Sequence, residues 1–367
     1  MHRKVLLVHL SRFSEYFSLI AASVLLFISL SACSSLRLTS SNPEFYVFRL
    51  EPPALVETSA DGQPLREIPI SLPVGCGLND FFPSPRGAWL AIELSCSFGQ
   101  AVVWLNTDTS ELKQAVTDSD SHFLAWTPDG EAVYLKVNSI NQPKIVRVHT
   151  DGARDTLPIT ELTYDLAPLP NGRDFIFSFS RGMGFGSEMD IARFDGRSLT
   201  RFAADPGFYL SFARWSPDEK QIAYIKIPDS QTPFTVGGLW VMSADGSKAR
   251  KLADADAGHG YAPAWSPDGN QLAFVKRENP NDVVADQSAD ALVSNIYLAN
   301  VQNGAVLPLT AFKDARVESP DWSPDGNQIA FTVVMNDKMS VVLADPASGE
   351  TRQVLTGSVC CPAWIQK

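Results

Sequence analysis

The chain has 367 residues, of which 45% are hydrophobic and 10% aromatic, a composition that supports a folded core and excludes an intrinsically disordered protein. Its formal net charge is −11, and no block of five or more like charges occurs. Because such a surface repels phosphate backbones, the composition argues against nucleic-acid binding.

Residues 1–32 are predicted to be a signal peptide. Arg3, Lys4 and Arg12 give a positively charged start, and residues 17–32 carry no charge. This apolar run is shorter than the roughly 20 residues that a permanent membrane helix requires. It is typical of a secretory signal, which is removed from the mature protein.

The sequence "LSAC", Leu30 to Cys33, follows the apolar run directly and resembles the bacterial lipobox, whose cysteine receives a lipid and becomes the new N-terminus. The resemblance implies that Cys33 is lipidated and that residues 33–43 form a short linker. It also implies an extracytoplasmic protein, anchored through this lipid to the bacterial cell membrane or the outer membrane, because a diacyl anchor is enough for stable attachment. The alternative is an ordinary cleaved signal, or a signal anchor, with a chance cysteine.

A Ser-Pro-Asp-Gly turn, or a degenerate copy of it, recurs along the rest of the chain. The copies begin at Ser84, Thr127, Leu169, Ser216, Ser266 and Ser323. Periods of about 40–50 residues with several short strands in each unit indicate a β-propeller. Each unit, or blade, is predicted to contain four strands, because β-branched and aromatic runs alternate with clusters of Gly, Pro, Asn and Asp.

Each residue of the motif "WSPDG" at 265–269 has a structural role. Pro presets φ at the second turn position, Asp tolerates the third, and Gly accepts a positive φ at the fourth. The preceding tryptophan is large enough to fill the wedge between neighbouring sheets. We therefore interpret the motif as architecture, with its Asp bonded to its own turn and poorly placed for catalysis.

The two ends of the repeat region are predicted to complete one blade together. Residues 45–72 contain three strands and lack a first one, whereas "PAW" at 362–364 repeats the "PAW" at 263–265. A C-terminal strand beside three N-terminal strands closes the ring and removes an exposed sheet edge. We therefore predict an all-β fold, a seven-bladed propeller over residues 44–367, with six blades as the alternative.

The sequence motif "WSPDG-x-x-I/L-A-F" is similar to the WD40-like repeat of TolB-type propellers, which also occurs in propellers attached to peptidases of the prolyl-oligopeptidase family. The resemblance covers nearly all of residues 44–367 and is strongest in the copies at 216, 266 and 323. It implies the fold and restricts function little, because propellers support many activities.

The position four residues before each tryptophan is predicted to mark the mouth of the central channel. Around the ring it holds Asn79, His122, Tyr164, Ser211, Tyr261, Glu318 and Cys360. Asp80, Asp165 and His259 are expected beside them on the same face. The position two residues after each of these mouth positions mostly holds an apolar side chain, as expected for strands around a channel. This arrangement resembles a ligand cup, and a solvated rim without a ligand is the alternative.

Two long loops and four cysteines are expected on this same face. The loops are "RGMGFG" at 181–186, read as a flexible rim loop, and residues 277–293, whose simplest reading is a mobile surface loop. Cys76 and Cys96 are predicted to form a disulfide. Cys360 and Cys361 can be free, can form a bridge with each other, or can pair with Cys76, because connectivity cannot be derived from sequence.

These features favour a non-enzymatic, monomeric binding module for an envelope protein or a small ligand, TolB-like in fold, with no bound cofactor or metal. No Gly-x-Ser-x-Gly elbow or phosphate-binding loop occurs. The alternative is a hydrolase or lyase for carbohydrates or lactones. Its channel site, possibly holding a metal, would use His122, His259, Asp80, Asp165 or Glu318, although the two histidines show no ligand spacing.

Overall fold

The computed structural model describes residues 43–97, 99–114, 120–138, 143–180, 189–230, 232–256 and 261–365. The chain divides into two units, Met1–Asn42 and Pro43–Lys367, and only the second is described. The predicted signal peptide, Cys33 and nearly all of the linker therefore lie outside the described residues. Within the described part, no helix combines the length and apolar character needed to cross a membrane.

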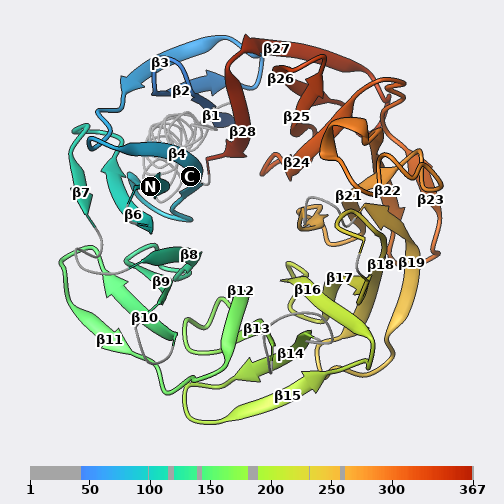
Figure 1. Cartoon of the computed structure of the whole chain (residues 1–367), viewed down its shortest axis with the longest axis horizontal. Coiled ribbons are helices and arrows are strands. Elements are labelled where there is room, and N and C mark those ends of the chain that lie inside the picture. Colours follow the sequence, from blue (N-terminus) through green and yellow to red (C-terminus); the bar gives the residue numbers. More distant parts are fainter. Residues whose placement is uncertain are drawn as a thin grey trace, which may run out of the picture. The chain divides into compact units, whose positions relative to one another are not determined.

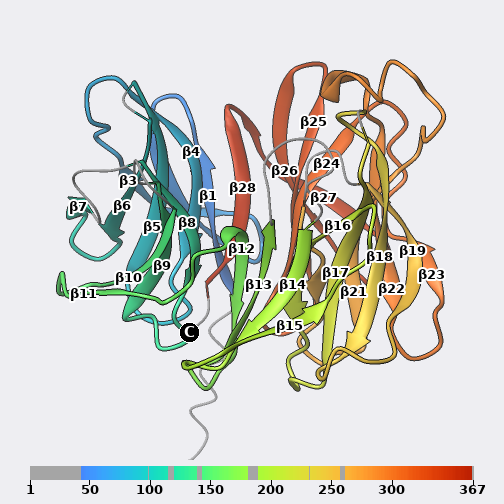
Figure 2. The ribbon, with the colours of Figure 1, turned by 60° about the horizontal axis from the view of Figure 1, so that its bottom comes forward.

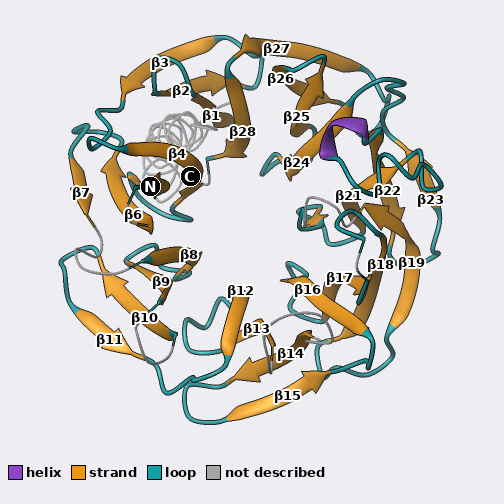
Figure 3. Ribbon diagram, in the orientation of Figure 1, coloured by secondary structure: helices purple, strands orange, loops and turns teal. Residues whose placement is uncertain are grey.

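The described chain is built almost entirely from β-strands (Figure 3). One sheet consists of β28 (Val359–Trp364), β1 (Glu44–Arg49), β2 (Ala54–Ser59) and β3 (Pro64–Pro69). A second consists of β4 (Cys76–Pro83), β5 (Trp89–Cys96), β6 (Gly99–Asn106) and β7 (Leu112–Gln114). A third consists of β8 (Ser121–Trp126), β9 (Ala132–Val137), β10 (Lys144–His149) and β11 (Arg154–Thr156).

The next eight strands form one sheet: β12 (Leu162–Pro168), β13 (Phe175–Ser180), β14 (Met189–Phe194), β15 (Leu199–Ala203), β16 (Phe208–Trp215), β17 (Gln221–Pro228), β18 (Val236–Ser243) and β19 (Arg250–Asp256). The last two sheets contain β20 (Ala264–Trp265), β21 (Gln271–Arg277), β22 (Ser294–Asn300) and β23 (Val306–Pro308), and then β24 (Arg316–Trp322), β25 (Ile329–Met335), β26 (Lys338–Ala344) and β27 (Thr351–Gly357). A short 3₁₀ helix, Ala289–Ala291, lies between β21 and β22.

The eight-stranded sheet consists of two four-strand groups, β12–β15 and β16–β19. A single parallel bridge, Met189 to Tyr209, joins them. The two groups also pack face to face, because Ile176 and Ile191 share a buried cluster with Ile222. Six further clusters lie between the other neighbouring groups. On this division the described strands form seven groups of four, which we call the closing blade and blades 1–6 in chain order.

The blades of Pro43–Lys367 are arranged in a ring (Figure 1). The first strand of each repeat, such as β8 or β12, faces the centre, and the fourth, such as β11 or β15, lies outside. Figure 2 shows neighbouring sheets side by side with loops at both ends of the strands. Stacking explains the burial pattern: Phe175–Ser180 on β13 is buried at every residue, whereas Arg154–Thr156 on β11 is fully exposed.

The closing blade has the predicted composition, with the C-terminal strand beside three N-terminal strands. β28 pairs antiparallel with β1, and Phe45 lies opposite Trp364 while Arg49 lies opposite Val359. The Phe45 and Trp364 rings are in contact, with centroids 4.9 Å apart. Pairing of the two ends of the repeat region thus removes the sheet edge that either would leave exposed.

The repeated tryptophan does more than fill space, because its indole N–H donates a hydrogen bond to the innermost strand of the preceding blade. The five donor–acceptor pairs are Trp126 to Phe82 O (2.8 Å), Trp215 to Ala167 O (3.3 Å), Trp265 to Arg214 O (3.0 Å), Trp322 to Ala264 O (3.1 Å) and Trp364 to Asp321 O (3.1 Å). In every pair the acceptor precedes the residue at the tryptophan position of that blade. Two blades have Pro83 and Pro168 at this position and lack the donor.

The turn after the tryptophan is held by its own side chains, as predicted. In blade 5, Ser266 Oγ donates to Asp268 Oδ1 (2.6 Å) and accepts the N–H of Gln271 (2.9 Å). Gly269 has a φ of 71°, which favours glycine. A Cβ at Gly269 would also lie 3.6 Å from Pro217, the proline of the preceding turn. The turns therefore stack on one another around one face of the ring.

Replacing Trp322 by Phe is expected to destabilise the fold beyond the loss of ring size, because it leaves the Ala264 carbonyl without its donor. The matched control is Trp104→Phe: Trp104 is equally buried, and its indole nitrogen has no hydrogen-bond partner among the described residues. We expect Trp322→Phe to cost about 1–3 kcal/mol more than Trp104→Phe in denaturant unfolding. Equal losses would contradict a role for the indole bond.

Candidate functional site

The innermost strands do not run straight past the channel, because most of them contain a β-bulge just before the tryptophan position. The pairing register shifts within the four residues before this position in β4, β8, β12, β16 and β24, and opposite the same part of β28. Three residues at these bulges have positive φ, namely Phe212 (56°), Ser319 (51°) and Cys361 (59°). A bulge leaves its extra residue unpaired and redirects its side chain.

A cavity of about 720 Å³ lies between these strands. The position three residues before the tryptophan supplies much of its lining: Asp80, Phe123, Phe212, Ala262, Ser319 and Cys361. Further aromatic rings come from the neighbouring positions: Phe82, Trp126, Trp215, Tyr261 and Trp265. The wall therefore combines aromatic side chains with four prolines and three charged side chains, Asp80, Arg214 and Asp321.

Much of the cavity wall comes from the residue after the predicted position. Of the nine candidate rim residues, Asp80 and Tyr261 line the cavity. Asn79 is exposed, and Tyr164 is 49% exposed with its ring 5.7 Å from the Lys136 amine. Ser211 was expected at the channel mouth but is buried, with only 3% of its surface exposed. His259 lies outside the described residues.

Glu93 on β5 is a buried carboxylate that the sequence reasoning did not single out. Its Oε1 lies 3.2 Å from His122 Nδ1 and accepts a 3.4 Å bond from Asn79 Nδ2, and its Oε2 accepts the Phe123 N–H at 3.2 Å. Two predicted rim residues thus meet on a carboxylate from the second strand. The signal was present in "WLAIELSC", where one charged residue interrupts a buried run.

Tyr261 and Glu318, both predicted rim residues, lie together in a second polar cluster. Glu318 Oε1 accepts a bond from Arg316 Nε at 2.7 Å, and Arg316 Nη1 lies 3.3 Å from Asp290 Oδ1. Burial raises the pKa of Tyr261 well above its usual range, and the nearby Glu318 carboxylate raises it further. Tyr261 is therefore a neutral hydrogen-bond donor at the cavity wall.

Asp80 and Asp321 place two carboxyl groups in the cavity wall. Asp80 Oδ1 accepts the Phe81 N–H at 2.8 Å, and Asp321 Oδ2 accepts the Trp364 N–H at 2.9 Å. Burial raises the pKa of each group to about 6. Asp321 was not predicted as a site residue, although a charge directly before the tryptophan, inside an inner strand, could have indicated it.

Asp165, also predicted for the rim, lies at the junction of blades 3 and 4. Its Oδ1 accepts the Ser178 N–H at 3.2 Å, and its Oδ2 lies 3.7 Å from Arg214 Nη1. Arg214 also donates from Nη1 to the carbonyl of Ala213 at 2.9 Å. The basic side chain of the cavity wall thus has a carboxylate partner of its own.

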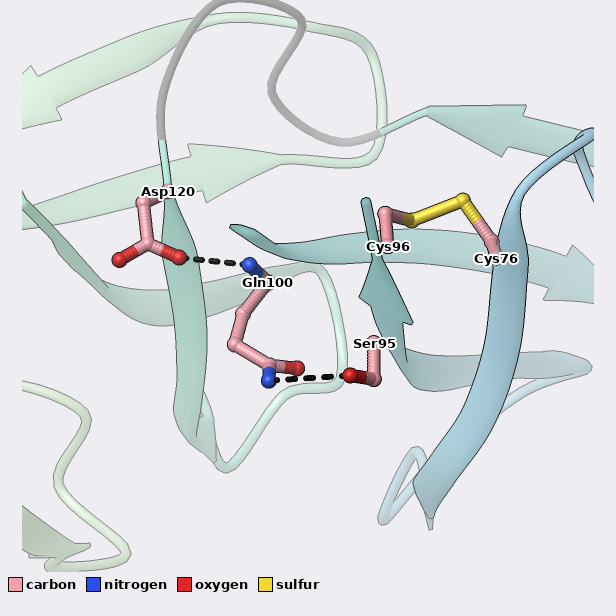
Figure 4. Close-up of a disulfide and its surroundings, with 5 residues drawn as sticks. All are labelled: Cys76, Ser95, Cys96, Gln100 and Asp120. Carbon is pink, nitrogen blue, oxygen red and sulfur yellow. Dashed lines mark hydrogen bonds between the residues drawn. A yellow bond between two sulfur atoms is a disulfide. The ribbon is translucent and has the colours of Figure 1, made fainter. Parts of the chain in front are cut away.

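The structure places both pairs of cysteines in disulfides. Cys76 and Cys96, the predicted pair, are bonded between β4 and β5 with Cα atoms 4.0 Å apart (Figure 4). Beside them, Asp120 Oδ1 accepts the Gln100 N–H at 2.6 Å. Of the alternatives left open for Cys360 and Cys361, the structure has the bond between the two neighbours.

The long loop between β21 and β22 is ordered by Arg277, contrary to the expectation of a mobile loop. The Arg277 side chain is only 1% exposed, and its Nη1 contacts both Asp286 Oδ1 (2.9 Å) and the Phe234 carbonyl (2.8 Å). Its Nη2 donates to the Asp282 carbonyl at 2.9 Å. One buried guanidinium therefore connects three segments, while the glycine-rich loop 181–186 lies outside the described residues.

The alternative enzyme hypothesis would need side chains able to hold a metal ion. In the part of the chain that the structure describes, no three or more His, Cys, Asp or Glu side chains gather so as to hold a metal ion. His122 lies against Glu93 and 3.9 Å from Asp120, away from the cavity lining.

Comparison with solved structures identifies the fold. TolB from Acinetobacter baumannii superposes over 85% of this chain and 78% of its own, with a TM-score of 0.50 and 18% sequence identity. The chain is a TolB-like β-propeller. A manganese-bound oligogalacturonate lyase shares the fold as well, with a TM-score of 0.57 at 14% identity over 85% of this chain and 84% of that one.

Sequence comparison agrees with this TolB-like fold, and no protein-family profile matches the chain. A TolB homologue from Chlorobium luteolum is 27% identical over 195 residues, which is 51% of this chain and 39% of that protein. Uncharacterized protein Atu1656 from Agrobacterium fabrum is 26% identical over 220 residues, 54% of this chain and 69% of the relative. Dipeptidyl-peptidase 5 from Porphyromonas gingivalis is 30% identical over 146 residues, 39% of this chain and only 20% of the peptidase.

Because its pKa is raised, we expect Asp321 to make the folded protein less stable as pH rises. Its folded pKa of about 6 lies above the usual 3.8, so between these values the folded state holds a proton that the unfolded chain releases. The stabilising effect of this proton is complete below about pH 4 and is lost as pH rises through about 6. The free energy of unfolding should fall by up to about 3 kcal/mol over this range. We expect Asp321→Asn to reduce this pH dependence in denaturant melts.

The control for this experiment is Asp325→Asn, in the turn just after Trp322. Although desolvation opposes them, hydrogen bonds from Ser323 and Asn327 lower the pKa of the exposed Asp325, so its stabilising effect is lost as pH falls. In the control variant, the free energy of unfolding should therefore still fall above about pH 4 as it does in the wild type. Equal pH profiles for Asp321→Asn and the wild type would show that Asp321 does not titrate as described.

Proposed function

We propose that this TolB-like propeller is a lipid-anchored binding module outside the cytoplasm, and that it docks an envelope protein. The docking surface is the loop face, which we define as the face bearing the loops between second and third strands and the connections into the innermost strands. The opposite face bears the Ser-Pro-Asp-Gly turns. The observation that carries the proposal is where exposed apolar side chains gather.

Exposed large apolar residues concentrate on the loop face. Among the described residues, five of the eight such side chains lie in its loops or beside them: Val74 (102% exposed), Tyr164 (49%), Val283 (75%), Val284 (60%) and Met335 (48%). The other three, Leu65, Leu199 and Leu307, lie singly on outermost strands. Because exposed apolar side chains favour contact with another protein, this uneven distribution points to the loop face as the docking surface.

The loop that carries Val283 and Val284 is held in place before any partner binds. Asp282 Oδ1 accepts the N–H of Val284 at 2.9 Å, and Asn279 Nδ2 contacts Asp282 Oδ2 at 3.1 Å. Arg277 fixes the base of the same loop. A preorganised loop loses little conformational entropy on binding, so its exposed valines can contribute most of their burial energy to affinity.

Replacing Val283 and Val284 together by Asp is expected to reduce capture of the partner at least about tenfold, because it puts two charges into an apolar contact. The measurement is in-cell photo-crosslinking from the loop face, followed by quantification of the crosslinked species. Leu307→Asp is the control, since Leu307 is 66% exposed on an outermost strand of the same blade. Equal crosslinking in both variants would exclude the loop face as the docking surface.

The anchor is tested separately by Cys33→Ser. Since the lipobox resemblance makes this cysteine the acceptor of the lipid, the variant should lose incorporation of a clickable fatty acid and move from the membrane fraction to the soluble fraction. The propeller should fold unchanged, because Cys33 precedes the compact unit Pro43–Lys367. Labelling and membrane association that survive the substitution would refute lipidation at Cys33.

A further inference from the structure

The charges in the wall of the channel cavity do not balance. Of its three charged side chains, Arg214 lies 3.7 Å from the carboxylate of Asp165, which compensates its charge. Asp80 and Asp321 remain. The Asp80 carboxyl also has an acidic neighbour, Glu93. Burial raises the pKa of Asp80, and the charge of Glu93 raises it further. The cavity is thus left with an excess of acidic groups.

Each of these carboxyl groups keeps acceptor capacity for a ligand. Asp80 accepts its own neighbouring amide, from Phe81, on Oδ1, and Asp321 accepts the Trp364 amide on Oδ2. Among the described residues, neither forms an ion pair with a lysine, arginine or histidine. A carboxylate oxygen carries about two acceptor sites, so one oxygen of each group is available at the wall. A buried carboxyl without a counter-charge favours binding of a cation.

The rest of the wall suits an organic cation better than a hydrated metal ion. The Phe82 and Phe123 rings are stacked, with centroids 4.0 Å apart and planes at 9°, and Phe212 and three tryptophans add further ring surface. Aromatic faces attract ammonium groups through their quadrupole, most strongly where water is excluded. The volume of about 720 Å³ lies within the usual range for small-molecule sites.

We propose that the channel cavity binds a small organic ammonium ion, with Asp80 and Asp321 as its counter-charges and the aromatic wall against its hydrocarbon groups. This site goes beyond the proposed docking of a protein on the loop face. It is also independent of that function, because the loop-face variants change no residue of the cavity wall.

The test is isothermal titration calorimetry of the purified wild-type protein with organic ammonium ions and a neutral isostere. Choline, tetramethylammonium and benzyltrimethylammonium serve as cations, and 3,3-dimethylbutan-1-ol has the shape of choline without its charge. We expect at least one cation to bind, and choline to bind at least about tenfold more tightly than the alcohol. This comparison requires no variant, so it holds even if a substitution impairs folding.

Asp80→Asn and Asp321→Asn should each weaken binding of the cation at least about tenfold, because each removes one counter-charge. Asp245→Asn, which neutralises an exposed turn carboxylate, should leave the affinity unchanged and controls for net charge. Three results would overturn the proposal: no binding of any of the three cations, equal binding of the alcohol, or unchanged affinity in both cavity variants. Tighter binding of Mn²⁺ alone or of a neutral sugar would also overturn it and assign the cavity to that ligand.

Discussion

The bond from each tryptophan indole to a carbonyl of the preceding blade is the interaction on which the ring depends. Apolar packing between sheets is not directional, so it can hold neighbouring blades together without fixing their stagger. An N–H···O bond at the inner ends of the strands fixes both distance and direction. Trp364 completes the series by binding the last full blade to the closing one. Where proline stands at the tryptophan position, aromatic pairs connect the blades instead, Phe48 with Phe81 and Tyr134 with Phe175.

The same strand ends also build the cavity. In the blades that carry the tryptophan, it fixes the end of the inner strand just after the irregular residues, and residues before it line the cavity. The repeat thus determines where the wall lies, while the non-repeated residues at the bulges determine its chemistry. A carboxyl such as Asp80, a ring such as Phe123 and a half-cystine such as Cys361 occupy equivalent places in different blades. The side-chain chemistry of the wall therefore varies where the repeat is least regular, and the fold constrains that variation little.

The architecture could be predicted from sequence because tryptophan, turn and period are local signals that recur. Pairing of β28 with β1 followed from one short copy, "PAW" at 362–364. The cavity wall was missed by one residue, since Phe212 and Ser319 adopt positive φ without a glycine to indicate it. Asp321 and Glu93 were missed because their roles depend on burial between blades, which no single repeat reveals. The ordered loop depended on Arg277, which bonds to acceptors in its own loop and to the distant Phe234 carbonyl.

Hydrogen exchange of the indole N–H groups measures directly whether the indole bonds join the blades, because all eight tryptophans lie in the described residues. NMR resolves indole protons from backbone amides, and single Trp→Phe variants assign them. The account predicts that the indole protons of Trp126, Trp215, Trp265, Trp322 and Trp364 exchange only as the propeller unfolds globally, far more slowly than that of the half-buried Trp89. If the five exchange as fast as Trp89, the blades are not joined through these bonds, and the account of the ring is wrong.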